Sequence, residues 1–470
     1  MNAPPGHGGA GAWPLSRRRA GVLLHPTSLD GGDGALGARA RAFIDWLASA
    51  GFSVWQVLPL GPTGKGGSPY WARSDHGGNP RLIDRSERPD AQALRGQFEA
   101  FLAANSFWLE DYVLFEALAD RFDGAPWWEW PPPYRDRETR VLEPTRHELS
   151  DVLQRRRIEQ WQFEWQWSAL RAYAAERGIL LFGDLPIYVA PDSVATWAAR
   201  EQFQLTADGR PAVLAGVPPD YFSADGQLWG NPLYDWGRAQ QDNFAFWRAR
   251  LARQLQRFDL LRIDHFRGLA AYWAVPAGAA TAREGRWYPA PGAELLRAFA
   301  ADFPALPIVA EDLGVITPDV EALRDSYHLA GMRVLQFGFG GDGTNIHLPH
   351  NYVPLAVAYT GTHDNDTTLG WYRSLDGTTR MRADLYLGLG SDPGWGGGAG
   401  AVPAAAARAV LASVARLAVL PAQDLLGLGS EARLNTPGTD AGNWSWRMHE
   451  GALTAELAAH YRALNEVYGR

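Results

Sequence analysis

Residues that could act as a nucleophile and its partner stand together at 258–268, Phe-Asp-Leu-Leu-Arg-Ile-Asp-His-Phe-Arg-Gly. The segment begins as an apolar run typical of a buried strand, and alternation along that strand places Arg262 and Asp264 on one face. A fixed cation beside a carboxylate favours the ionised form, which a nucleophilic carboxylate requires. The alternative interpretation is a structural ion pair that ties the end of a strand to its loop.

Three other apolar runs also end in acidic residues. The residues that follow these runs include Asp184, Glu311 and Asp364. Each acid alone could be a loop cap or half of an ion pair. Enzymes built on barrels of parallel strands carry their chemistry at the carboxyl ends of the strands. Four acids at corresponding strand ends therefore predict one convergent site.

Carboxylates that converge beside aromatic rings suit the cleavage of a glycosidic bond. Asp264, beside its cation, is suited to attack the anomeric carbon. Glu311 follows Ile-Val-Ala without a basic neighbour, and an apolar flank raises the pKa of a carboxyl group, as a general acid requires. Asp364 would contact sugar hydroxyls as a third acid. His363 could donate to the same sugar, or it could cap its own loop.

A cluster of acids could also hold a divalent metal ion. Arg262 and His363 stand beside the acids and could neutralise them, so the sequence predicts no metal. The 21 tryptophans favour a sugar site. Several of them, including Trp229 and Trp444, stand in polar or Gly-rich segments where their rings would be partly exposed, and a flat ring beside hydrogen-bonding groups suits the face of a sugar.

Eight apolar runs predict strands, and helical patterns lie between most of them. The runs are 20–25, 52–60, 178–187, 258–263, 306–310, 331–339, 355–359 and 417–420. Strands that alternate with helices form parallel units of the α/β class. Eight such units predict a (β/α)8 TIM barrel.

The chain is longer than a barrel needs. A barrel of this type has about 250 residues, whereas this chain has 470. The long connections, which predict inserted subdomains, lie near 61–177, 184–257 and 370–402. We therefore expect one catalytic domain over residues 1–470, with residues 1–14 disordered.

Composition restricts the class of protein. The net charge of −8 and the isoelectric point near 5.8 argue against a nucleic-acid partner, for which a value above about 9 is typical. The chain has no cysteine, which excludes disulfides and suits a reducing cytoplasm. No apolar run reaches the roughly 18 residues of a membrane span, and the run at 20–24 is too short for a signal peptide. We expect a cytoplasmic protein that does not bind membranes.

Motifs spread over most of the chain carry a family resemblance. The most specific is the segment 216–232, which contains GVPPDYFS and QLWGNP. Others are GVLLHPTSL (21–29), WQVLPLGP (55–62), SPY (68–70), FGDLPI (182–187), RIDHFRG (262–268), AEDLG (310–314), GTHDN (361–365) and QDLLGLGSE (423–431). With these motifs the chain resembles the amylomaltases, or 4-α-glucanotransferases (disproportionating enzyme), of glycoside hydrolase family 77 in the α-amylase superfamily.

The resemblance implies transfer of an α-1,4-glucan segment to the 4-hydroxyl of an acceptor sugar, with retention and without a metal or organic cofactor. Its substrates would be maltooligosaccharides and fragments of starch or glycogen. The resemblance implies Asp264 as nucleophile, Glu311 as acid/base and Asp364 as transition-state stabiliser. The further residues implied to contact substrate are Tyr70, Asp184, Tyr221, Phe222, Trp229, Arg262, His363 and Asn435. It also implies that the C-terminal β-sandwich of α-amylases is absent.

Transfer and hydrolysis share a covalent glycosyl-enzyme, and they differ in whether a sugar or water reaches it first. Bulk water is at about 55 M, whereas an oriented acceptor can reach an effective molarity of roughly 10⁵ M. Tyr221, Phe222 and Trp229 on a loop over the cleft could bind an acceptor and exclude water. The alternatives are an α-1,4-glucan hydrolase with side transfer and a non-catalytic glucan-binding protein. We expect a monomer or a weak homo-oligomer.

Overall fold

The computed structural model describes residues 13–30, 34–64, 66–89, 94–219, 224–389, 399–439 and 441–470. Tyr221 and Phe222, which we expect on a loop over the cleft, lie outside the described residues. Residues 1–12, most of the segment predicted to be disordered, also lie outside them.

Eight parallel strands form the central sheet, one for each predicted run. They are β1 (Arg19–Leu23), β2 (Val54–Gln56), β3 (Leu180–Leu185), β6 (Leu260–Ile263), β9 (Ile308–Ala310), β10 (Gly331–Val334), β11 (Ala356–Tyr359) and β12 (Leu417–Pro421). The sheet runs β10-β11-β12-β1-β2-β3-β6-β9. A parallel bridge between Val309 and Ala330 joins β9 to the chain entering β10. The sheet is therefore a nearly closed barrel, which confirms the predicted fold class.

Alternation along the barrel strands decides which side chains face the interior. Leu260 of β6 and Val309 of β9 belong to one buried cluster inside the barrel, while the residues that follow them pack against the outer helices. Successive side chains of a strand point to opposite sides, so every second residue faces the interior. Arg262, two residues after Leu260, and Glu311, two residues after Val309, therefore also face inward. The apolar interior thus leads directly into charged groups at the carboxyl ends of the strands.

The chain before β1 extends the interior of the barrel. Trp13 and Leu15 pack in the same buried cluster, and the carbonyl of Pro14 accepts a hydrogen bond of 2.9 Å from Arg19 Nε. The sequence predicted disorder through residue 14. Trp13 and Pro14 are instead held against the barrel, because the indole and the Leu15 side chain remove apolar surface from water there.

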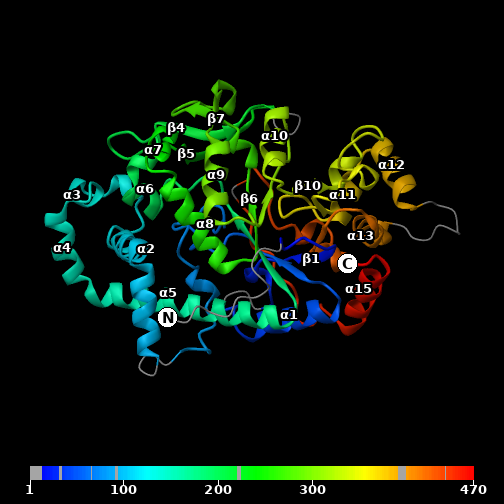
Figure 1. Cartoon of the computed structure of the whole chain (residues 1–470), viewed down its shortest axis with the longest axis horizontal. Helices are drawn as coiled ribbons and strands as arrows, with labels where there is room; N and C mark the ends of the chain where they lie inside the picture. The colour runs from blue at the N-terminus through cyan, green and yellow to red at the C-terminus, as the bar shows by residue number, and fades with distance from the viewer. Residues whose placement is uncertain are drawn as a thin grey trace.

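Helices that follow the strands pack around the barrel (Figure 1). They are α1 (Ala38–Ser49), α5 (Ser150–Glu176), α8 (Ala245–Arg257), α9 (Gly292–Asp302), α10 (Pro318–Ser326), α11 (Thr368–Ser374), α13 (Val402–Ala412) and α15 (Ala455–Val467). Helix α10 begins at Pro318, and the side chain of Thr317, the N-cap residue, forms no capping hydrogen bond. The Thr317 hydroxyl instead accepts a hydrogen bond of 3.0 Å from Arg267.

The long connection between β2 and β3 is largely helical. It contains α2 (Arg95–Arg121), α3 (Pro132–Arg135) and α4 (Thr139–Glu148), and it leads into α5. Figure 1 shows these helices beside the barrel. Phe115, Trp130, Trp161 and Trp197 belong to a second buried cluster, the last of them supplied by α6 (Val194–Ala198). The insertion therefore has an aromatic core of its own.

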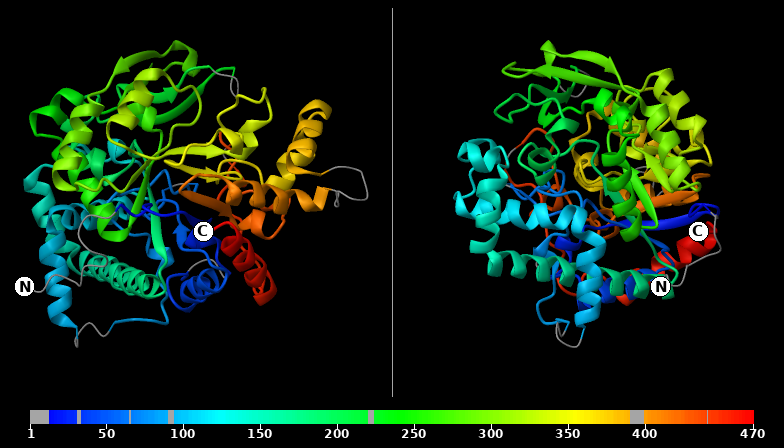
Figure 2. Two further views of the ribbon diagram at one scale, coloured as in Figure 1. Left: turned by 45° about the vertical axis from the view of Figure 1, so that its right-hand side comes forward. Right: turned by 60° about the vertical axis from the view of Figure 1, so that its left-hand side comes forward.

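A second sheet was not predicted from the sequence. It is antiparallel, in the order β5-β4-β7-β8. Its strands are β4 (Val213–Val217), β5 (Gln227–Pro232), β7 (Ala271–Pro276) and β8 (Arg286–Pro289), and α7 (Trp236–Gln241) follows β5. Two of its strands come from the connection between β6 and β9, so this connection is a fourth insertion in addition to the three predicted ones. Figure 2 shows the sheet at the top of the molecule, beyond the barrel.

The remaining elements close the carboxyl-terminal part of the chain. Helices α12 (Gly377–Leu387) and α14 (Ala422–Leu425) flank α13 and β12 in the sequence, and Arg462 of α15 donates to the carbonyls of Ser49 and Ala48 at the end of α1. Over the ranges that the structure describes, the strands form only the two sheets named above, so no C-terminal β-sandwich is present in them. In the same ranges no helix is long and apolar enough to cross a membrane.

Candidate active site

Asp264 and Glu311 emerge from neighbouring strands at the same level. Ile263 of β6 pairs with Ala310 of β9, and each acid is the next residue along its chain. The amide of Glu311 donates to the carbonyl of Ile263 over 3.1 Å, and its carbonyl accepts from the amide of Phe266 over 3.1 Å. Adjacent strands lie about 4.8 Å apart, so the two acids begin from neighbouring backbone positions at one level of the barrel.

A buried ion-pair chain orients Asp264. Arg262 Nη1 donates to both carboxylate oxygens of Asp184, over 2.9 and 2.7 Å, and Nη2 donates to Asp264 Oδ1 over 2.8 Å. Arg262 and Asp184 are buried, whereas the Asp264 side chain is 28% exposed. The hydroxyl of Tyr70 also donates to Asp184, over 2.6 Å. The guanidinium thus fixes a carboxylate that stays open to solvent, and the prediction that both side chains share one face is confirmed.

Glu311 has the surroundings of a general acid. Its Oε2 accepts a hydrogen bond of 2.7 Å from the amide of His265, and its Oε1 accepts one of 3.1 Å from the amide of Leu313. Burial raises the pKa of Glu311 to about 8, although the positive charge of Arg262 opposes this shift, and the charge of Asp264 adds to it. Glu311 is therefore protonated at neutral pH and can donate a proton.

Asp364 is held by side chains from a separate segment of the chain. Asn435 Nδ2 donates to Asp364 Oδ1 over 2.6 Å, and Arg433 Nη2 donates to the Asp364 carbonyl over 2.8 Å. His363 Nε2 lies 3.3 Å from Asp364 Oδ2. The Asp364 side chain is 41% exposed, so the carboxylate has a fixed direction and an open face.

Tyr70 joins the Asp184 part of the site to the Asp364 part. Its ring stacks on that of His363, with centroids 5.2 Å apart and an interplanar angle of 12°, and the Trp444 ring lies 6.0 Å away. Burial, with the negative charges of Asp184 and Asp364, holds the pKa of Tyr70 well above its usual range. Side chains that the sequence places far apart therefore meet in one site.

Trp229 connects the second sheet to this site. Its ring meets the His265 ring edge-on, with centroids 4.8 Å apart, and the Tyr188 ring at 6.2 Å. Its Nε1 donates to Gln227 Oε1 over 3.0 Å, and the residue is partly exposed. Because His265 directly follows Asp264, the indole of Trp229 stands beside the proposed reaction centre.

A groove continues from the site along Trp444. Its walls include His25, Pro69, Asn79, Trp444 and Arg447. An indole ring beside groups that can form hydrogen bonds suits the apolar face and the hydroxyls of a sugar chain. Within the described residues, no group of three or more histidine, aspartate and glutamate side chains is arranged to hold a metal ion.

Three features of this site were not predicted from the sequence. The His265 amide reaches Glu311 because His265 has a left-handed backbone, with φ of 47°. Among residues other than glycine this conformation is uncommon even for histidine, so the residue type alone does not predict it. Trp444 was expected to be partly exposed, which it is, but no sequence pattern predicted that its ring lies beside Tyr70 and His363. Arg433 follows β12, in a segment whose path across the barrel no sequence pattern predicts.

The chain matches known proteins along nearly all of its length. The sequence profile of the 4-alpha-glucanotransferase family, glycoside hydrolase family 77, matches residues 24–93 and 84–454. The chain belongs to this family. The family and the enzyme class predicted from the sequence are therefore confirmed.

Individual members of the family are similar to this chain from end to end. The 4-alpha-glucanotransferase of Thermus thermophilus is 47% identical over 500 residues, which cover 96% of this chain and 99% of the relative. That of Synechocystis sp. is 44% identical, with 97% and 99% covered. The amylomaltase from Streptococcus agalactiae, solved in complex with acarbose, superposes with a TM-score of 0.90 at 34% identity, and 97% of this chain and 100% of that one are covered. The likeness therefore includes the insertions as well as the barrel.

Proposed function

We propose that this protein transfers α-1,4-glucan segments to the 4-hydroxyl of glucose or maltodextrin acceptors by a retaining double displacement. The proposal rests on its family and on one observation above all. An ionised carboxylate held by Arg262 and a carboxyl group with a pKa of about 8 follow paired residues of neighbouring strands. Retaining glycosidases use two carboxyl groups in these two states.

In the first displacement, Asp264 attacks the anomeric carbon of the donor sugar. Arg262 holds one carboxylate oxygen, so the approach of the nucleophile is set before the substrate binds. Glu311 gives its proton to the leaving oxygen of the glycosidic bond, which departs with the reducing-end part of the donor. The product is a covalent ester between Asp264 and the glucan segment.

In the second displacement, the roles of Glu311 reverse. Its carboxylate, now without the proton, removes a proton from the 4-hydroxyl of the acceptor, and this oxygen attacks the anomeric carbon of the ester. Asp264 leaves as a carboxylate, and Glu311 regains its proton. Two inversions at the same carbon give net retention.

Asp364 stabilises the transition state through hydrogen bonds to hydroxyls of the donor sugar that strengthen as the ring distorts. Its orientation by Asn435 and its exposed face suit this role. His363 is adjacent and donates to the same sugar. Tyr70 and Asp184 complete the wall of this subsite, with Arg262 between Asp184 and the nucleophile.

The acceptor lies on the side of the second sheet. Trp229, next to His265, offers a ring for stacking. We assign Tyr221 and Phe222 to acceptor binding and water exclusion from their place in the family motif alone. An acceptor held there competes with water because an oriented reactant has an effective molarity of up to roughly 10⁵ M or more.

Incubation with maltotriose tests this proposal. Transfer yields glucose together with chains longer than maltotriose, and the number of reducing ends stays constant. Hydrolysis yields glucose and maltose, and the number of reducing ends rises. A rise that accounts for all the maltotriose consumed would contradict the proposal and favour the hydrolase alternative. Unchanged maltotriose would favour a glucan-binding protein. The cytoplasmic location and the monomeric or weakly oligomeric state stay predictions.

A further inference from the structure

A buried charge cluster lies between α8, α5 and the loop of residues 68–79, which carries Tyr70 and is called here the Tyr70 loop. Three arginines from successive turns of α8 are 0%, 5% and 1% exposed, and two carboxylates face them. The members of the cluster are Asp75, Glu164, Arg250, Arg253 and Arg257. None of them belongs to the site described above.

The ion pairs of this cluster are short and shielded from water. Asp75 pairs with Arg250 over 2.9 Å, and Glu164 binds Arg253 over 2.6 Å and Arg257 over 3.2 Å. Three cations face two carboxylates, and burial, with the charge of Arg253, lowers the pKa of Arg257 to about 10. Replacing buried charges with apolar side chains often stabilises a protein. Stability alone therefore does not explain the cluster.

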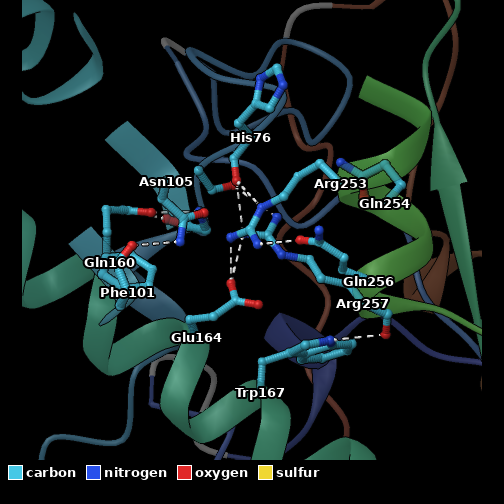
Figure 3. Close-up of polar contacts among 12 residues, drawn as sticks. His76, Phe101, Asn105, Gln160, Glu164, Trp167, Arg253, Gln254, Gln256 and Arg257 are labelled. Atoms are coloured by element: carbon cyan, nitrogen blue, oxygen red, sulfur yellow. Dashed lines mark hydrogen bonds and ion pairs between the residues drawn. The ribbon is translucent and has the colours of Figure 1, made fainter. Parts of the chain in front are cut away.

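Arg253 and Arg257 also donate to the backbone of the Tyr70 loop. The carbonyl of His76 accepts from Arg253 Nε over 3.2 Å and from Arg257 Nη2 over 2.8 Å, and the carbonyl of Gly77 accepts from Arg257 Nη1 over 3.2 Å. Figure 3 shows both guanidinium groups between the carboxylate below them and this backbone above. Glu164 thus orients two side chains that together hold one turn of the loop.

Neighbouring residues hold the same turn from two further directions. Gln254 of α8 donates to the carbonyl of Asp75 over 2.8 Å. Gln160 of α5 accepts from the amide of Gly78 over 2.8 Å and donates to its carbonyl over 2.9 Å. A Cβ atom at Gly78 would lie 2.1 Å from the ring of Phe163, so the backbone here is pressed against α5. The clamped end of the loop therefore has little freedom to move.

The other end of the loop reaches the active site. The Tyr70 hydroxyl donates a hydrogen bond to Asp184, and the Tyr70 ring stacks on that of His363. Between the two ends, Arg73 binds Glu116 of α2 over 2.7 Å and Asp192 over 2.9 Å. The loop is thus held by α2 and α5 of the helical insertion and by α8, which precedes β6, and it carries the Tyr70 ring.

We propose that the buried charge cluster positions Tyr70 in the active site, and that α5 and α8 act on the reaction through it. Arg253 and Arg257 are positioning residues, because they touch the loop and not the substrate. The inference rests on the proposed function, in which Tyr70 lines the donor subsite. It predicts that a change in the cluster weakens the binding of substrate more than it slows the bound complex.

The variant Arg257→Met tests the proposal with little risk to the fold. It removes both carbonyl contacts of Arg257 and leaves two cations facing two carboxylates. We expect KM for maltotriose to rise about 10-fold with kcat changed less than about 3-fold, since a small misplacement of a binding group costs up to about 100-fold. Arg257→Lys should recover part of the loss. The matched control is Arg248→Met, because Arg248 lies on the same helix and pairs with Asp302 on its exposed face.

A double-mutant cycle separates positioning from a general effect on the fold. In a Tyr70→Ala background, Arg257→Met should change kcat/KM less than about 2-fold, because the group that it positions is already absent. If the fold-losses of kcat/KM in the two single variants multiply in the double variant, the proposal is overturned. If Arg257→Met does not fold, Gln254→Leu serves in its place, because it removes one hydrogen bond to the same turn. It should raise KM for maltotriose by a smaller factor. An unchanged KM in Gln254→Leu would then overturn the proposal.

Amide hydrogen exchange gives a measure that does not depend on activity. In Arg257→Met, amides of residues 68–79 should exchange at least about 10-fold faster, whereas those of the barrel strands should keep their rates. If the loop amides of Arg257→Met exchange at the wild-type rate, the inference is overturned. A wild-type protein that leaves maltotriose unchanged would instead overturn the proposed function.

Discussion

The amide of His265 donates a 2.7 Å hydrogen bond to the carboxylate of Glu311. His265 directly follows Asp264, and its left-handed backbone, with φ of 47°, turns this amide toward the neighbouring strand. One turn of backbone therefore sets both acids of the proposed mechanism. The relative position of nucleophile and acid/base is a property of two paired strands, and it does not depend on a mobile loop.

Replacement of the proposed nucleophile should abolish turnover. Asp264→Asn keeps the shape of the side chain but cannot form the glycosyl ester, so kcat on maltotriose should fall by more than about 10³-fold. The Asp264→Asn protein should still bind maltotriose, as measured by calorimetry. Asp302→Asn on the surface is a control that should change neither value. Turnover near the wild-type rate in Asp264→Asn would remove Asp264 from its role.

The loss of rate on replacing the proposed acid/base should depend on the leaving group of the substrate. Glu311→Gln cannot protonate a departing sugar, so cleavage of maltotriose should fall by about 10²–10⁴-fold. Fluoride needs no such proton, so release of fluoride from an α-maltosyl fluoride in the first displacement should fall far less. Stopped-flow measurement of the fluoride burst compares the two. Equal losses on both substrates would argue against an acid/base role.

The pH dependence of activity should report the raised pKa of Glu311. The first displacement needs the protonated form, so kcat/KM on maltotriose should be steady at neutral pH and fall as pH rises through about 8. A fall centred several units higher, or one that persists unchanged in Glu311→Gln, would assign the titration to another group.

Stability gives an independent check of the same pKa. Because the folded state keeps a proton on Glu311 that the unfolded state loses near its usual value, folding binds a proton between the usual pKa of 4.5 and about 8. The free energy of unfolding therefore falls by up to about 1.4 kcal/mol per pH unit across this window. Glu311→Gln should gain stability over wild type between about pH 5 and pH 8, as measured by chemical unfolding. If the unfolding free energies of Glu311→Gln and wild type differ by the same amount at pH 5 and at pH 8, the pKa of Glu311 is not raised.

Arg262 should matter for both stability and turnover. Arg262→Met leaves the buried carboxylate of Asp184 without its cation, which costs about 3–5 kcal/mol of unfolding free energy, and it also frees Asp264 from its orienting partner. The double variant Arg262→Met with Asp184→Leu removes both buried charges. It should recover most of the stability but none of the turnover. A double variant as unstable as the single one would show that the pair is not the source of the loss.

The barrel could be predicted from the sequence because its strands are covered on both faces, so each is a continuous apolar run. In β12 every position is buried. The second sheet gave a weaker signal. Strands β4 and β7 are short apolar runs, VLAGV and AYWAVP. Their partner strands are not: every position of β8 is exposed, and most of β5 is only partly buried, because this sheet does not lie within the barrel core. Without an apolar run or a regular alternation in β5 and β8, the sequence does not show that the four segments pair.

The acids of the site could be predicted because they follow apolar runs directly, and a strand end is visible in the sequence. Trp444 and Arg433 could not, because tertiary contacts alone bring their segment over the barrel. The Trp444 amide donates to the carbonyl of Leu434, and the Met448 amide donates to that of Ser28 in the loop after β1. Such contacts depend on the folded barrel and leave no local pattern.

In the proposed mechanism, Asp264 forms a covalent bond to the transferred glucan. The most direct test is intact-mass and peptide-mass spectrometry of Glu311→Gln after incubation with α-maltosyl fluoride, since loss of the base should slow the second displacement and let the ester accumulate. We expect a mass increase of one maltosyl group, located on the peptide that contains Asp264. A maltosyl group on any other residue, or release of maltose of inverted configuration without an adduct, would contradict it.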